Sequence, residues 1–393
     1  MGIISNGITI IDNGAIGSDK VDTVQIAASA VETAKIADAQ ITLAKLTATG
    51  TKDATTFLRG DNTFAAVGGG TPYGLFTKVD PTVVAWNKTG AFTLTTNTGL
   101  YIEVNGDIKT IASGTSITMP TATAGTDYAI WCTTAGALQA TTDHVSPPSA
   151  NARKVGGFHY APGENAAGTS GGNLTPSINV YSLWDLKWRP SCPDPRGMTL
   201  VGGFFWSDIY LTGVDHQING TSKYNVTIAD GSSPPKVPSL YGGNGSTTYG
   251  TYKWFECSEL LASHGKRVPT WQEFSALAYG TTENTSKVGA PTVTNIDASS
   301  DNFTSKWGVI MSTGCMQVWG NHFGGGQMAA NYSNNTEGRG HTNTLSQVVT
   351  FGGYNNPPSA AYSGSRASWW NNLPTVTNAF IGSRGVCDHT TNE

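Results

Sequence analysis

Apolar side chains near the N-terminus recur at every fifth position. The row consists of Ile16, Val21, Ile26, Val31, Ile36, Ile41 and Leu46. Residues spaced five apart do not fall on one face of an α-helix, and they do not fall on one face of a β-strand either. We therefore predict a repeat whose copies wind together between several chains, most simply three, because a single thin unit buries little apolar surface. One or two short helices are the alternative, since the segment also contains apolar pairs four residues apart.

The pattern changes after Gly68-Gly69-Gly70, which has the composition of a linker. Short β-branched and aromatic runs then alternate with glycine-containing turns. Asn105-Gly106 separates two of these runs, which is a strong signal for a two-residue β-hairpin. The sequence therefore predicts a β-sandwich-like domain over residues 71–166.

Helical periodicity is convincing in only two places, around residues 252–264 and 270–279. Thr270 and Glu273 have the spacing of a capping box, and Gly265 is placed to end the preceding helix. We therefore expect a mainly β protein with an α+β C-terminal domain. The predicted parts are an N-terminal attachment and shaft region (1–66), the β-sandwich-like domain (71–166) and the C-terminal domain (177–393).

Composition excludes some classes of partner. Only 13% of the residues are charged and the formal net charge is -4, so the chain lacks the basic footprint that nucleic-acid binding requires. It has no 18-residue apolar run and no basic segment before an apolar core at its start, so we expect neither membrane insertion nor a signal peptide. The five cysteines are widely spaced, and we expect buried thiols, with a Cys315–Cys387 bridge left open.

Two similar tetrapeptides stand out between Phe351 and His389. We call Ser363-Gly364-Ser365-Arg366 the first frame and Gly382-Ser383-Arg384-Gly385 the second frame. Asn, Tyr, Ser, Pro, Trp and Phe surround them without helical or strand periodicity. These residue types make good contacts at low entropic cost, so the stretch suggests a rigid scaffold that carries an adaptable surface. The alternative is an ordinary Gly-rich and Asn-rich loop of a β-rich domain.

Several motifs resemble known families. GKRVPTWQEF (265–274) is similar to the signature of the formylglycine-generating-enzyme branch of the C-type lectin fold. MTLVGGFFWSDIYLTG (from 198), YGGNGSTTY (241–249) and both frames resemble the receptor-binding tips of phage tail fibres of the major tropism determinant type. TTFLRGDNTFA (55–65) resembles a segment that precedes such tips.

This resemblance implies a homotrimeric fibre tip on the virion. Its C-type lectin-like domain, over residues 177–393, would display hypervariable side chains that a diversity-generating retroelement alters. The expected partners are a bacterial surface receptor, either protein or glycan, further copies of the chain, and other tail-fibre or baseplate proteins at the N-terminus.

Alignment of the two frames with this family carries its variable positions onto this chain. They are Asn356, Pro358, Ser359, Ala360, Tyr362, Trp369, Asn371, Asn372, Val376, Asn378, Phe380 and Ile381. Diversification replaces adenines, and an asparagine codon altered at its first two bases can encode every residue in this set except Trp369. Trp369 is the one position in the set that this codon chemistry does not reach.

Four residues in or near the frames are expected to form the scaffold. Arg366, Arg384 and Asp388 can form charge-assisted hydrogen bonds that hold the loop backbone while its neighbours change. Trp370 is not reachable from an asparagine codon, and we expect it to pack beneath the surface.

Two other functional classes remain as alternatives. A copper oxidase like the formylglycine-generating enzymes would need a cysteine pair, for which Cys315 and Cys387 are the candidates. His322, His341 and His389 are scattered, and the neighbours Asp215-His216 and Asp388-His389 are more typical of surface hydrogen bonds than of catalytic pairs. Calcium-dependent sugar binding would need a Glu-Pro-Asn or Gln-Pro-Asp triplet, which the chain lacks. We expect no catalytic residue, cofactor or metal, and calcium-independent carbohydrate binding stays open.

Overall fold

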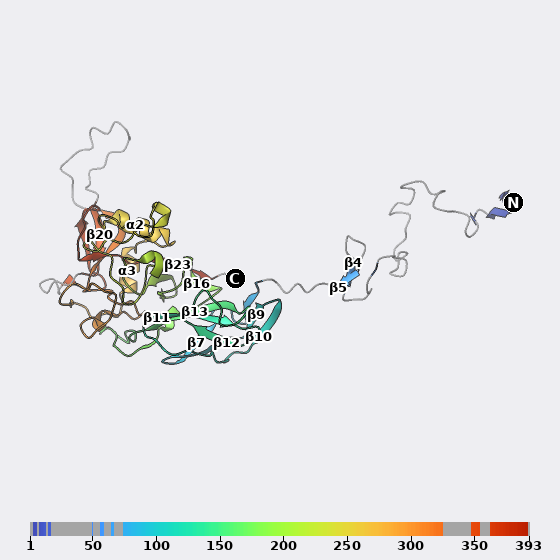
Figure 1. Cartoon of the computed structure of the whole chain (residues 1–393), viewed down its shortest axis with the longest axis horizontal. Coiled ribbons are helices and arrows are strands. Elements are labelled where there is room, and N and C mark those ends of the chain that lie inside the picture. Colours follow the sequence, from blue (N-terminus) through green and yellow to red (C-terminus); the bar gives the residue numbers. More distant parts are fainter. Residues whose placement is uncertain are drawn as a thin grey trace, which may run out of the picture. The chain divides into compact units, whose positions relative to one another are not determined.

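The computed structural model describes residues 3–5, 8–12, 15–16, 49, 56–58, 64–66, 74–324, 347–353 and 362–391 (Figure 1). The chain forms two compact units, 1–70 and 71–393. In the first unit, β1 (Ile3–Ser5), β2 (Ile8–Asp12) and β3 (Ala15–Ile16) form an antiparallel sheet, and β4 (Thr56–Leu58) pairs with β5 (Phe64–Ala66). The five-residue row beyond Ile16 lies outside the described residues, so the repeat and its trimeric winding stay a prediction.

The second unit begins with short antiparallel strands. The strands are β6 (Phe76–Lys78), β7 (Trp86–Gly90), β8 (Thr93–Thr96), β9 (Leu100–Val104) and β10 (Asp107–Ile111). The turn between β9 and β10 confirms the predicted hairpin, because Val104 pairs with Asp107 and only two residues connect them. Asn105 and Gly106 both have positive φ, 54° and 90°, as a tight turn of this kind requires.

A nine-stranded sheet runs through the second unit. It contains β11 (Thr126–Cys132), β12 (Leu138–Thr141), β13 (Arg153–Ala161), β14 (Ser177–Ile178), β15 (Trp184–Asp185), β16 (Trp188–Pro190), β17 (Met198–Val201), β18 (Phe205–Asp208) and β23 (Val386–Thr391). Strand β23 lies between β16 and β18, so the C-terminal end of the chain is hydrogen-bonded into the middle of this unit. The predicted boundary between 71–166 and 177–393 stays a prediction.

Helices are few and short in the described part of the chain. They are η4 (Val180–Ser182), α1 (His216–Asn219), η5 (Ser239–Tyr241), α2 (Trp254–Ser263), α3 (Trp271–Leu277) and η6 (Asp301–Phe303). The capping box of α3 is confirmed: the Glu273 amide donates to Thr270 Oγ1 at 3.2 Å, and the Thr270 amide donates to the Glu273 carboxylate at 2.9 Å. Gly265, with φ +68°, follows the end of α2 as expected. None of the described helices is long and apolar enough to cross a membrane.

A four-stranded sheet contains the last part of the candidate region. Its order is β21 (Ser368–Asn372), β20 (Gln347–Phe351), β19 (Gln317–Gly324) and β22 (Ile381–Gly382). Strand β22 runs parallel to β19, and the other pairs are antiparallel. Trp319 and Phe351 are fully buried, and the Phe351 ring stacks on Phe274 of α3 with centroids 5.0 Å apart. This core fixes β20 and β19, and they in turn position β21.

Candidate functional site

Strand β21, an edge strand of the four-stranded sheet, carries three of the predicted variable positions. Trp369 lies opposite Thr350 and Asn372 lies opposite Val348 on β20. Asn371 is exposed, whereas Trp369 and Asn372 are partly buried. The side-chain amide of Asn372 donates a hydrogen bond of 2.9 Å to Thr350 Oγ1. The pairing shifts by one residue between Val348 and Thr350, so the regular alternation of faces is interrupted along this part of β21.

The loop 373–380, which connects β21 to β22, is held through its backbone. The Trp254 amide donates to the Pro374 carbonyl at 3.2 Å, the Gly231 amide to the Asn378 carbonyl at 3.1 Å, and the Gln317 amide to the Phe380 carbonyl at 2.8 Å. These bonds do not depend on which side chains the loop residues carry. They support the course of the loop when its side chains change. One further bond depends on a side chain, because the Phe380 amide donates to Asn378 Oδ1 at 3.0 Å.

Gly231 packs closely beneath this loop. A Cβ atom added there would lie 2.3 Å from the Asn378 amide nitrogen and 2.7 Å from Thr377 Oγ1. Both atoms belong to the loop 373–380, and the nearer one belongs to its backbone. The absence of a side chain at position 231 thus allows the loop to pack directly on the neighbouring segment.

The structure divides the predicted variable positions by exposure. Tyr362 is 67% exposed and Phe380 40% exposed, and Asn371 is also exposed. The partly buried positions are Trp369, Asn372, Val376 and Asn378. Asn356, Pro358, Ser359 and Ala360 lie outside the described residues. Together, the side chains at Tyr362, Asn371 and Phe380 give the region an accessible surface of amide and aromatic groups.

Ile381 is a correction to the predicted set. Its side chain is 2% exposed and packs in a core cluster with Trp319 and Val348. The cause is strand pairing, because Ile381 begins β22 and lies beside Gln317 in the buried first half of β19. A side chain in that position does not reach a partner on the surface.

Arg384 of the second frame binds backbone carbonyls, but not those of the variable loop that we expected it to hold. The guanidinium is fully buried and donates to the carbonyls of Asp208 at 2.8 Å, Ile209 at 2.7 Å and Ile310 at 2.6 Å. Burial lowers the pKa of Arg384 to about 10, although the charge of Asp208 opposes that shift. The segments that Arg384 holds are thus remote in sequence from the variable loop.

Asp388 takes part in a charged cluster at the protein surface. Its carboxylate accepts a hydrogen bond of 2.8 Å from Arg267 Nη2, which also lies 2.8 Å from Glu273 Oε1. Glu273 in turn caps α3. The expected charge-assisted bond of Asp388 is therefore present, and it connects β23 to the start of a helix.

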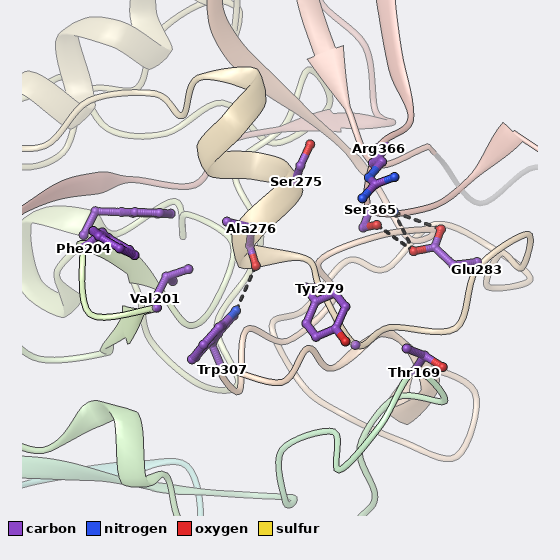
Figure 2. Close-up of a pocket in the computed structure, with 13 residues that line it drawn as sticks. Thr169, Val201, Phe204, Ser275, Ala276, Tyr279, Glu283, Trp307, Ser365 and Arg366 are labelled. Atoms are coloured by element: carbon purple, nitrogen blue, oxygen red, sulfur yellow. Dashed lines mark hydrogen bonds between the residues drawn. The ribbon is translucent and has the colours of Figure 1, made fainter.

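The first frame is supported by Glu283, which the sequence did not indicate. The Ser365 amide donates to both carboxylate oxygens of Glu283, at 3.1 and 3.2 Å, and Ser365 Oγ donates at 2.7 Å (Figure 2). Arg366, from which we expected this support, is exposed, and its side chain makes no hydrogen bond or ion pair with any residue that the structure describes. Glu283 precedes Ser365 by 82 residues, so no local pattern connects the two.

The expectation that Trp370 packs beneath the surface is wrong. Its side chain is 40% exposed, and its ring centroid lies 5.8 Å from that of His322 on β19. The reason is the position of β21 at the end of the four-stranded sheet, where the neighbouring strands cover a side chain only in part.

The candidate enzymatic residues are not gathered into one site. All five cysteines are free and buried, and Cys315 and Cys387 belong to different core clusters, so the bridge between them is not formed. His216 Nδ1 lies 2.8 Å from His264 Nε2, and His389 Nδ1 accepts a hydrogen bond from Trp206. His341 lies outside the described residues. Within the described ranges, no three His, Cys, Asp or Glu side chains are grouped as metal ligands.

Comparison with known proteins identifies the relatives of this chain. A family described as the Mtd second domain matches residues 84–185. The tail fiber receptor-binding protein of Bordetella phage BPP-1 is 50% identical over 323 residues, which cover 80% of this chain and 84% of that protein.

Solved structures agree with this finding. The major tropism determinant M1 variant has a TM-score of 0.75 and 48% identity, covering 81% of this chain and 87% of that one. The I1 variant has a TM-score of 0.78 and 46% identity, covering 88% of this chain and 97% of that one. The expected fold class, mainly β with a C-type lectin-like domain, is confirmed. The chain belongs to the major tropism determinant family of phage tail-fibre receptor-binding proteins.

Proposed function

We propose that this protein is a phage tail-fibre tip that binds a bacterial surface receptor through the side chains of β21 and of the loop 373–380, together with Tyr362. We call this surface the variable face. The observation that carries the proposal is the contrast within the loop: its backbone is hydrogen-bonded to Trp254, Gly231 and Gln317, while Phe380 remains 40% exposed. On a face of this kind, the side chains can be exchanged while the backbone hydrogen bonds that hold the loop are kept.

The exposed positions Tyr362, Asn371 and Phe380 form the centre of the proposed contact. The partly buried positions Trp369, Asn372, Val376 and Asn378 contribute at its rim, and Asn356, Pro358, Ser359 and Ala360 complete the set of diversified positions. Aromatic rings supply contact area at low entropic cost, and amides supply adaptable hydrogen bonds. Retroelement-driven exchange at these positions would alter receptor choice.

The protein acts as a homotrimer on the virion tail in this proposal. Its N-terminal region attaches it to other tail-fibre or baseplate proteins. Three copies of the face per fibre raise the effective affinity for a dense receptor layer by roughly 10²- to 10⁴-fold when the geometry permits simultaneous contact. Weak binding by one face is therefore sufficient for adsorption.

The proposed activity is binding without catalysis and without a bound metal. We expect adsorption to host cells to be the same in buffer and in EDTA, because amide and aromatic groups need no cation to make contact. Cell binding of the purified protein with and without chelator checks this. Loss of binding in EDTA that calcium restores would point to a calcium-dependent lectin instead.

Replacement of several face residues tests the proposal directly. In a panel of variants, Asn371, Asn372, Asn378 and Phe380 are exchanged together for other residues that asparagine codons can reach. The trimer and its unfolding midpoint should be retained, because the loop is held by backbone bonds, while binding to host cells changes.

Matched controls carry Val145→Ser or Val288→Ser, at positions that are 87% and 81% exposed and outside the face. These controls should bind as the parent does. Unchanged adsorption across the face panel would refute the site.

A further inference from the structure

A pocket of about 710 Å³ lies beside the first frame (Figure 2). Its lining includes Phe204 from the turn between β17 and β18, Tyr279 just after α3, Trp307, and Ser365 and Arg366 of the first frame. None of its lining residues is among the predicted variable positions. The pocket thus belongs to the constant part of the molecule, yet it adjoins the segment that leads into the variable face.

The aromatic floor of the pocket is fixed by several contacts. Trp307 Nε1 donates to the Ala276 carbonyl at 2.8 Å, and the Trp307 ring packs edge-on against Tyr181 with centroids 4.9 Å apart. The Lys306 ammonium lies over the rings of Tyr279 and Trp307, at 5.9 and 5.5 Å from their centroids. An occupant would meet these rings already in position, which lowers the entropic cost of binding.

Phe204 is unusually accessible for a phenylalanine. Its side chain is 82% exposed, directly after Gly202 and Gly203, whose φ values of +60° and +82° form the tip of the β17–β18 hairpin. Exposed aromatic residues beside an apolar pocket mark interaction sites, where they contribute a large share of the binding energy. Phe204 therefore points to a partner that covers it.

The charges around the pocket indicate the chemistry of that partner. Figure 2 shows Phe204 on one side of the pocket and Arg366 on the opposite side, with Tyr279 between them. The Glu283 carboxylate already accepts hydrogen bonds from Ser365, whereas Arg366 has no carboxylate partner among the described residues. An available guanidinium matches an incoming carboxylate, to which it can donate two parallel hydrogen bonds.

We propose that this pocket is a constant subsite of the receptor contact that takes a short segment of a receptor protein with an apolar or aromatic side chain next to a carboxylate. The apolar group packs between Phe204 and Tyr279, and the carboxylate pairs with Arg366. This inference rests on the proposed function and adds the class of ligand to it. The constant subsite would hold a common feature of the receptors while the variable face selects among them.

The ligand chemistry is tested first with 3-phenylpropionate as the probe. Saturation-transfer NMR with the full chain should detect binding of this acid but not of phenethylamine, which presents an aromatic ring with a cation. Arg366→Gln should weaken binding of the acid about tenfold, since a charge-assisted pair contributes at least that much. Ser275→Trp, which fills the pocket from α3, should abolish it, and Phe255→Ser, at an exposed aromatic residue outside the pocket, should leave it unchanged.

Equal binding of the amine, or binding of the acid that persists in Ser275→Trp, would overturn the proposal. Phe204→Ser should weaken binding of the acid about 30-fold while the mass of the assembly stays the same. A fall in that mass would assign the pocket to contacts between copies of the chain and would overturn the proposal as well.

Adsorption separates this inference from the proposed function. Arg366→Gln and Ser275→Trp should each lower binding to host cells about tenfold or more, whichever residues the variable face carries. If the face panel alters adsorption and the pocket variants do not, the subsite is refuted while the proposed function stands. If neither the face panel nor the pocket variants alter adsorption, the subsite and the proposed function are both refuted.

Discussion

Gly364-Ser365-Arg366 and Gly382-Ser383-Arg384 are the same tripeptide in opposite surroundings. In the second, the arginine is fully buried and donates to carbonyls of four other residues. In the first, the arginine is exposed at the rim of a pocket, and the carboxylate of Glu283 holds Ser365 instead. Identical residues thus form a core clamp in one place and an open binding group in the other. The difference is made by the segments that pack around them.

The largest expected effect is a loss of stability when Arg384, the buried arginine, is replaced. Arg384→Leu removes the hydrogen bonds that a buried guanidinium donates to the carbonyls of Asp208, Ile209, Ile310 and Met311. We expect this loss to lower the free energy of unfolding by about 3 kcal/mol or more. Arg366→Leu, the matched change in the first frame, should alter it by no more than about 0.5 kcal/mol. Chemical denaturation of both variants measures the contrast, and equal losses would contradict the distinction between clamp and binding group.

Gly231, beneath the loop 373–380, and Gly364, in the first frame, should also differ in the cost of an added methyl group. Gly231→Ala places a methyl group 2.3 Å from the Asn378 amide nitrogen, so backbone must shift, and we expect a loss of about 1 to 3 kcal/mol. In Gly364→Ala the methyl group would lie 1.9 Å from Glu283 Oε2, at the end of a side chain that can rotate away. Its cost should be smaller than that of Gly231→Ala, and the reverse order in denaturation experiments would show that Glu283 is held rigidly.

Glu283 offers the smallest and most local test. Glu283→Ala removes the acceptor of the Ser365 hydrogen bonds at an exposed position, and we expect a loss of only about 0.5 kcal/mol. Hydrogen exchange at the Ser365 amide should nevertheless become faster, because that amide loses its partner. Glu283→Gln, which keeps a carbonyl acceptor, serves as the control and should retain part of the protection. Unchanged exchange in Glu283→Ala would mean that other contacts hold the first frame.

Local features of the fold were predictable from the sequence. The Asn105-Gly106 hairpin and the Thr270–Glu273 capping box follow from residues that are adjacent or three positions apart, and the structure confirms both. Gly265 marks the end of α2 in the same way. Such signals depend only on backbone conformation near the residue itself.

Features that depend on sheet order were not predictable. Ile381 is buried because β22 pairs with β19, and Trp370 is exposed because β21 stands at the end of that sheet. Glu283 reaches Ser365 across 82 residues of sequence. Alignment with the family supplied the candidate positions of the face and codon chemistry checked them, but only the packing of β19, β20 and β22 separates surface positions from core positions.

The central claim is that exchange of the side chains on the variable face changes receptor binding and leaves the stability of the fold unchanged. Its most direct measurement is the binding of purified trimer to host cells with Asn371, Asn372, Asn378 and Phe380 replaced together, at matched concentrations of folded protein. We predict a change in cell binding of about tenfold or more. The unfolding free energy should stay within about 1 kcal/mol of the parent. Parent-like cell binding by the replaced face would contradict the account.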